Sequence, residues 1–294
     1  MRKISACLIS SLIFITSAFC QPISLPDAYE PVIVKQFADD LYKNGFWDEA
    51  ASEYKRYLFL DGTAGSDSTE IDLSKEDTFF LLTTIYNSQN NKDGISWLST
   101  NFRNRMGPAV KEKLDLVSAR FTFKERNLED YLSLTTLIAP DFKDYSDEFV
   151  LLNSISISLL QMNIEEAISA ANQASQTYQI FTPFAQTGSH YKTKSPGLAL
   201  FFSAILPGSG KWYASSSFIP FLTSFVTVGS FTAATIYTGI KSEWKSWRPY
   251  VYGTCALVFY ITDLYGSYKS AQRWNNTKYR ELCEQADLIY EQLY

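Results

Sequence analysis

Residues that could do chemistry are few in this chain of 294 residues. With a single histidine, His190, the chain lacks a His-rich metal site, and no HExxH, CxxC or G-x-S-x-G pattern occurs. The acidic pairs Asp39-Asp40 and Glu165-Glu166 are adjacent in sequence, so on a helix their side chains point about 100° apart and make poor acid–base partners. We therefore expect no enzyme activity, no cofactor and no metal ion.

A glycine-rich segment before a lysine, Gly208-Ser209-Gly210-Lys211, has a superficial likeness to a phosphate-binding loop. Such a loop needs a glycine six positions before the lysine and a serine or threonine directly after it. Ile205 and Trp212 occupy those two positions here. The segment also follows an apolar helix rather than a strand, so the sequence does not predict a nucleotide site.

One acidic residue, Asp263, lies inside an otherwise uncharged apolar stretch. Ionisable residues within a membrane are costly and usually functional. At 1.5 Å per helical residue, however, Asp263 lies about 21 Å from Pro249 and could reach the membrane surface. Both interpretations are open at this point, and we favour the second.

The apolar segments that hold these residues are long enough to cross a membrane. No charged residue occurs from Trp212 to Ile240, which predicts a transmembrane helix within 217–240. A charged loop, 241–248, separates it from a second predicted span that begins at Pro249 and ends near residue 268, so the two form a transmembrane hairpin. Residues 195–212 are too short and too broken for a full span, and we favour a re-entrant half-helix over a third span.

A motif begins just before the hairpin, with the pattern KSPxxAxxxSxxxPGxGxxY. It is carried by Lys194, Ser195, Pro196, Ala199, Ser203, Pro207, Gly208, Gly210 and Tyr213. The pattern resembles that of uncharacterised bacterial membrane proteins related to the TM2-type hairpin domain, except that Lys211 replaces their usual glutamine. The resemblance implies a membrane domain (195–270) and, for some of those proteins, a link to membrane protein insertion. It implies no catalytic activity.

The N-terminal residues predict an export signal. Arg2 and Lys3 precede an uncharged apolar stretch that ends at Phe19, which is typical of a signal peptide over residues 1–20. Cleavage after Cys20 is one outcome, and lipidation of Cys20 is the alternative. We expect a bacterial cell membrane protein, in the inner membrane, with its helical domain exported to the periplasm.

Residues 21–186 predict an exported stack of helical hairpins. Residues 32–60 contain two apolar-periodic segments around a turn, with Phe37 in the first apolar stripe, and further helices are predicted over 108–125 and 127–138. The segment resembles a tetratricopeptide repeat, and 154–174 resembles a second one. The matching positions are Ala38, Leu41, Gly45, Ala50, Tyr54 and Tyr57, followed by Ala167 and Ala171. About four helical pairs are expected.

The predicted fold class is therefore all-α: a tetratricopeptide-like stack of helical hairpins, a linker at 187–194, and the transmembrane helical hairpin. Residues 271–294 form an amphipathic C-terminal helix that could dock on the repeats, lie on the membrane or bind a partner.

This organisation predicts a protein whose repeats bind or scaffold other proteins. Expected partners are envelope or membrane proteins and the lipid bilayer, and a homo-oligomer is compatible with the sequence. The net charge of −5 argues against nucleic acid. The alternative is an accessory factor for membrane protein insertion or assembly that acts through the hairpin.

Overall fold

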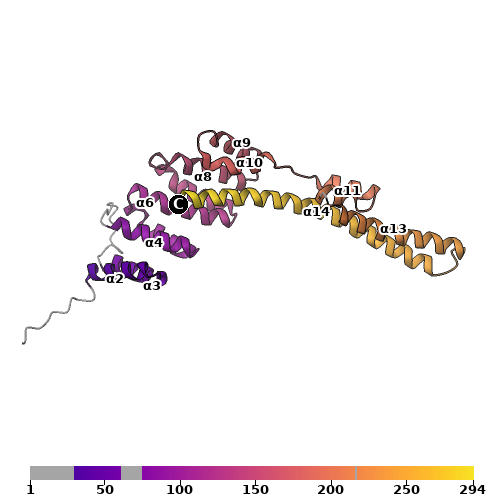
Figure 1. Ribbon diagram of the computed structural model, residues 1–294, viewed down its shortest axis with the longest axis horizontal. Helices are drawn as coiled ribbons and strands as arrows, with labels where there is room; N and C mark the ends of the chain where they lie inside the picture. The colour runs from indigo at the N-terminus through magenta and orange to yellow at the C-terminus, as the bar shows by residue number, and fades with distance from the viewer. Residues whose placement is uncertain (1–29, 61–74, 216) are drawn as a thin grey trace, which may run out of the picture. The chain divides into compact units, whose positions relative to one another are not determined.

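The structure is a computed structural model that describes residues 30–60, 75–215 and 217–294 (Figure 1). Within these ranges the regular elements are α-helices and short 3-10 turns, without a strand, so the predicted all-α class is confirmed. The predicted signal peptide and Cys20 lie outside the described residues.

The α-helices follow one another closely along the chain. Their bounds are α2 Pro31–Lys43, α3 Trp47–Leu60, α4 Glu76–Ser88, α5 Lys92–Phe102, α6 Pro108–Lys124, α7 Leu128–Ile138, α8 Asp147–Leu160, α9 Ile164–Ala174, α10 Thr182–Ser189, α11 Pro196–Ile205, α12 Ser209–Ser215, α13 Phe218–Lys241 and α14 Arg248–Leu293. The contacts divide the described residues into two compact units, one up to Ser118 and one from Ala119 onward.

In the first unit, α2 and α3 pack against each other as the predicted helical hairpin. Gly45 makes the turn with φ +81°, a left-handed conformation that glycine adopts without strain. Ala38 and Ala50 are fully buried, as close helix packing requires, and the buried Tyr54 donates its hydroxyl to Asp39 Oδ1 at 2.7 Å. Tyr57 is also buried, whereas Leu41 is half-buried.

The predicted position of Phe37 in the apolar stripe is wrong. Its side chain is 53% exposed, while Val34 and Ala38 are the buried residues of α2. These two residues are four apart and share one helix face, and Phe37 points about 100° away from Ala38. The buried face of α2 is therefore rotated away from Phe37 and centred on Val34 and Ala38, of which Ala38 was also predicted as a packing position.

The second unit contains α8 and α9, the second predicted hairpin. Ala167 and Ala171 are fully buried, as is Ile155 of α8. Small side chains at positions i and i+4 of α9 let the two helices approach closely. The packing positions that resembled a repeat are thus buried here as well.

The longest element is α14, which runs for 46 residues without a break. The sequence suggested a span that ends near residue 268 and a separate C-terminal helix. No proline follows Pro249 to end the helix, and the two segments form one element. Its first half packs beside α13, and its second half packs against α8 and α10 (Figure 1).

The C-terminal half of α14 is held by both apolar and polar contacts. Leu282 and Ala286 are fully buried. This amphipathic segment therefore docks on the helical domain, which is the first of the three predicted alternatives. Arg120 of α6 donates from Nε to Asp287 Oδ1 at 2.7 Å and also pairs with Glu291. Ion pairs and buried apolar side chains therefore both hold the C-terminal end of α14 against the second unit.

A buried hydroxyl network lies beside these contacts. The hydroxyls of Tyr131 and Tyr290 are 2.7 Å apart, Ser156 Oγ is 3.0 Å from the Tyr290 hydroxyl, and Tyr131 donates to Asn153 Oδ1 at 2.8 Å. Both tyrosines are almost fully buried. Burial raises the pKa of Tyr290 to about 12.

Tyr290→Phe is expected to lower the free energy of unfolding by about 1–3 kcal/mol, because the buried hydroxyls of Tyr131 and Ser156 each lose a hydrogen bond to the Tyr290 hydroxyl. In the unmodified protein the tyrosine binds its proton more tightly when folded. Its contribution is therefore complete below pH 10 and is lost between pH 10 and about 12. Thermal unfolding against pH measures both effects, and the variant should show a shallower alkaline loss. Tyr237→Phe, at a side chain that is 66% exposed, is the control. Equal behaviour of the two variants would contradict this account.

Candidate functional site

The motif residues build a short helical hairpin, α11 and α12, at the base of α13 and α14. Ser195 caps α11 by accepting a hydrogen bond from the Leu198 backbone N–H, and Pro196 occupies the first helical turn, where its missing N–H costs nothing. The chain then reverses at Pro207 and Gly208, and Gly208 has φ +87°. The sequence signals for a helix start and a tight turn are thus placed at the two ends of α11.

Two glycines are required by close backbone contacts. A Cβ on Gly210 would lie 1.8 Å from the carbonyl oxygen of Ala199, so α11 and α12 touch backbone to backbone. A Cβ on Gly208 would lie 2.5 Å from the carbonyl oxygen of Phe221 in α13. Real Cβ atoms do not approach this closely, so a larger residue at either position must displace a helix.

Alanines and serines complete the contact between α11, α12 and α14. Ala199, Ala214 and Ala271 are fully buried and pack together. Ser203 Oγ accepts the Gly210 backbone N–H at 3.0 Å and lies 2.7 Å from Ser267 Oγ. The small residues of the motif therefore form one packed and hydrogen-bonded junction of three helices.

Lys194 joins the ends of this junction. Its Nζ donates to the carbonyl oxygens of Tyr213 and Ala214 at 2.7 and 3.0 Å. Both belong to the last turn of α12, where carbonyl oxygens have no partner within the helix. The ammonium also lies 4.2 Å from the ring centroid of Trp274, and burial lowers the pKa of Lys194. The Tyr213 hydroxyl accepts the Ser195 backbone N–H at 3.3 Å. The end of α12 is thereby fastened to the start of α11.

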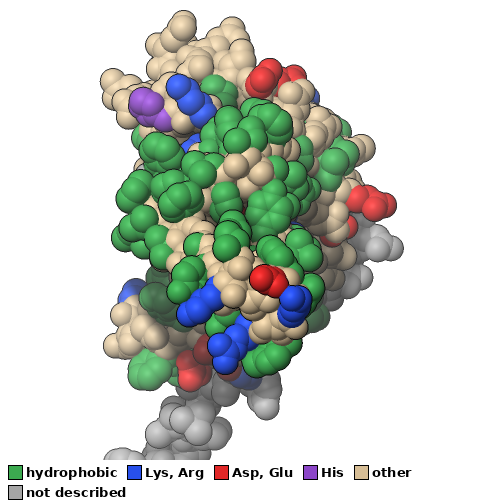
Figure 2. All heavy atoms as spheres, turned by 90° about the vertical axis from the view of Figure 1, so that its right-hand side faces the viewer, with side chains coloured by type: hydrophobic (Ala, Val, Ile, Leu, Met, Phe, Trp, Pro, Cys, Tyr) green, Lys and Arg blue, Asp and Glu red, His purple; other side chains and the backbone are tan. Residues whose placement is uncertain are grey.

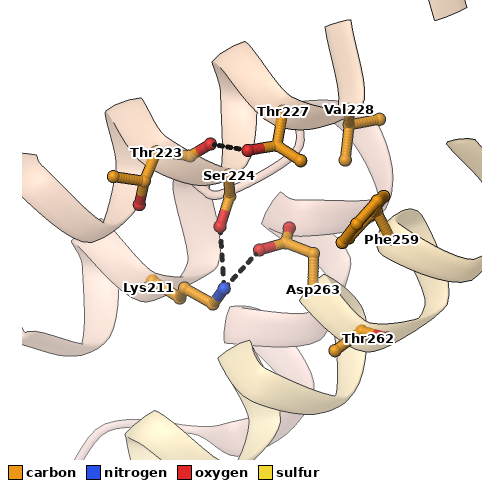
Figure 3. Close-up of a pocket in the computed structure, with 8 residues that line it drawn as sticks. All are labelled: Lys211, Thr223, Ser224, Thr227, Val228, Phe259, Thr262 and Asp263. Carbon is orange, nitrogen blue, oxygen red and sulfur yellow. Dashed lines mark hydrogen bonds and ion pairs between the residues drawn. The ribbon is translucent and has the colours of Figure 1, made fainter. Parts of the chain in front are cut away.

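The centre of the site is an ion pair between α12 and α14 (Figure 3). Lys211 Nζ lies 2.8 Å from Asp263 Oδ1 and donates to Ser224 Oγ at 2.7 Å. The other carboxylate oxygen, Asp263 Oδ2, accepts the Gly208 backbone N–H at 2.6 Å. Asp263 is only 3% exposed, so its side chain points into the helix junction rather than out to the surface.

The pair faces an open pocket of about 190 Å³ between α13 and α14. Its lining combines hydroxyl groups with apolar side chains, namely Lys211, Thr223, Ser224, Thr227, Val228, Phe259, Thr262 and Asp263 (Figure 3). The threonine hydroxyls donate to carbonyl oxygens of their own helices, as Thr227 does to Thr223 at 2.7 Å. The side-chain donors of the pocket that are not used up in this way are therefore those of Lys211 and Ser224.

No known protein family matches the chain. No curated protein and no solved structure is similar to it either. The resemblances to tetratricopeptide repeats and to TM2-related membrane proteins therefore stay predictions that depend on the quoted motifs.

The sequence identified Asp263 but missed its partner. The available signal is that Lys211, a charged residue, stands in an apolar segment where the resembling motif has glutamine, because a cation in such a segment needs an acidic partner. The amide groups of that segment are engaged inside the protein, since Gly208 and Gly210 donate to Asp263 and Ser203.

The remaining titratable candidates do not come together. Asp39 pairs with Lys35 at 3.1 Å and accepts the Tyr54 hydroxyl, which is a packing role. His190 is exposed at the end of α10. Among the described residues, no cluster of three or more His, Cys, Asp or Glu could hold a metal ion.

Proposed function

We propose that this protein is a membrane-anchored helical scaffold of the bacterial envelope that holds or recruits other proteins at the membrane. The observation that carries the proposal is the continuity of α14. Its first half presents exposed apolar side chains, and its second half is buried against α8 and α10 in the helical domain. One rigid helix therefore ties the anchor to that domain without a flexible linker.

The apolar surface of α11, α13 and the first half of α14 supports the anchor. The helix α13 is long and apolar enough to cross a membrane, and its 24 residues extend about 36 Å. Large apolar side chains are exposed over these helices: Phe201, Ile205, Ile219, Val226, Ile236, Ile240, Leu257, Val258 and Ile261. Figure 2 shows hydrophobic side chains covering much of the face at this end. A surface of this kind is costly in water and is covered in lipid.

The geometry of α11 and α12 supports a re-entrant placement. The ten residues of α11 extend about 15 Å, half of the hydrocarbon core, and α12 returns to the start of α11. The backbone groups at the turn are bonded to Asp263 and Ser203, as irregular backbone in a membrane requires.

The second candidate function is an accessory factor for insertion or assembly of membrane proteins. The pocket beside Lys211 and Ser224 favours it, because it opens between α13 and α14 and offers donors for a polar group of a client segment. In this case clients contact the hairpin rather than the repeats.

Site-specific photocrosslinking in cells separates the two functions. The crosslinker is placed at Phe59, an exposed residue of the repeats, or at Trp212, an exposed residue of α12. A scaffold should give one or two stoichiometric partners at Phe59 or at Phe37, which is exposed on α2. A spread of newly made membrane proteins at Trp212, with none at the repeat positions, would contradict the scaffold and support the accessory factor.

A further inference from the structure

A second polar groove lies on α14 and extends from beside Asp263 to almost four turns beyond it. It has a volume of about 520 Å³, is open to the outside, and is lined by Thr262, Tyr265, Gly266, Lys269, Gln272, Arg273 and Asn276. Because these residues recur at intervals of three or four, they form one face of the helix. Below, this set is called the basic groove.

We propose that the basic groove binds the phosphate headgroup of an anionic phospholipid. The inference rests on the membrane placement proposed above for α13 and the first half of α14. It concerns which lipid the anchor prefers. It also assigns to Lys269 and Arg273 the binding of the lipid phosphate, a role that the scaffold function does not require.

The charge of the groove is the first argument. Within the described ranges, neither Lys269 nor Arg273 has a carboxylate within ion-pair distance, although Lys269 lies over the Tyr265 ring at 5.8 Å. The next two cations on α14 are already paired, since Lys278 lies 2.7 Å from Glu281 and Arg280 lies 3.4 Å from Glu284. Two positive charges on adjacent helical turns are thus left for an external anion.

The depth of the groove is the second argument. Counting from Pro249, where the span begins, Lys269 lies about 30 Å and Arg273 about 36 Å along α14. The hydrocarbon core is about 30 Å thick, and the headgroup layer lies directly outside it. Lys269 and Arg273 therefore lie at the level of lipid phosphates.

The shape and donor set are the third argument. Arg273 offers a planar fork of N–H donors that matches phosphate oxygens. The Asn276 amide adds a neutral donor, and Gln272 Nε2, which donates one hydrogen to the Tyr268 hydroxyl at 3.1 Å, has a second. At its other end the groove is lined by the ring of Tyr265, and the exposed apolar side chain of Ile261 lies one helical turn before that residue in sequence. A ligand with an anionic head and an apolar chain, lying along α14, satisfies both ends.

Native mass spectrometry of the full-length protein, released from vesicles of phosphatidylcholine mixed with phosphatidylglycerol, tests this proposal. We expect phosphatidylglycerol to be retained over phosphatidylcholine by a factor on the order of tenfold, given two basic residues at the membrane surface. Lys269→Gln combined with Arg273→Gln should abolish that preference. The matched control, Lys278→Gln with Arg280→Gln, removes two paired cations from the same helix and should retain it.

Three outcomes would overturn the inference. The first is no lipid preference in the unmodified protein, and the second is an equal loss in both double variants, which would indicate net charge alone. The third is that inorganic phosphate protects the detergent-solubilised protein from unfolding as well as phosphatidylglycerol does, which would indicate a free-anion site. Flotation with phosphatidylcholine vesicles reports the membrane anchor separately. A protein that floats without lipid preference contradicts only this inference, whereas one that does not float contradicts the anchor as well.

Discussion

Lys211→Met is expected to lower the free energy of unfolding by about 3–5 kcal/mol, because it leaves the Asp263 carboxylate buried without its counter-ion. Asp263 is 3% exposed, and the remaining donor to it, the Gly208 N–H, is neutral. Thermal unfolding of the purified protein in detergent or lipid measures the loss. A melting temperature unchanged from that of the parent would contradict a structural role for the pair.

The double variant Lys211→Met with Asp263→Asn should recover most of that loss. Removing both charges eliminates the buried unpaired ion, and the asparagine oxygen still accepts the Gly208 N–H. Lys245→Met is the control, since its pair with Glu243 is highly exposed and contributes no more than about 1 kcal/mol. If the double variant is less stable than Lys211→Met alone, charge compensation is not what the pair supplies.

Gly210→Ala has the second large expected effect. The added Cβ would overlap the Ala199 carbonyl oxygen at 1.8 Å, and neither atom belongs to a flexible side chain. Separating α11 from α12 also strains the Gly210–Ser203 hydrogen bond, so we expect a loss of about 1–3 kcal/mol or more.

Gly229→Ala makes the same chemical change in α13 and is the matched control. Nothing lies within 4 Å of its added Cβ, so the stability should be unchanged or slightly higher. Melting temperatures of the two variants, measured side by side, test the close approach of α11 and α12. Equal melting temperatures would contradict it.

Local sequence patterns predicted the helices well, because apolar periodicity and turn residues act over a few residues. The prediction of 108–125 and 127–138 agrees with α6 and α7, and the prediction of 217–240 agrees with α13. Gly45 and the buried alanines around it followed from the same local signals.

The tertiary contacts were less accessible from the sequence. Lys211 and Asp263 are 52 positions apart, and no periodicity connects two residues across three helices. The unbroken α14 was missed for a different reason: its composition changes from apolar to polar near Lys269, and this change indicated a boundary between two elements. The exposure of Phe37 depends on a rotation of α2 that only packing determines.

Sided labelling of two exposed positions tests the proposed membrane hairpin most directly. Ser189→Cys lies at the end of the helical domain and Lys245→Cys lies in the loop between α13 and α14, with the parent chain giving the background from Cys255 and Cys283. In spheroplasts, a membrane-impermeant maleimide should label Ser189→Cys at once and Lys245→Cys only after permeabilisation. Equal labelling of both positions in intact spheroplasts would mean that α13 and α14 do not cross the membrane and would contradict the account.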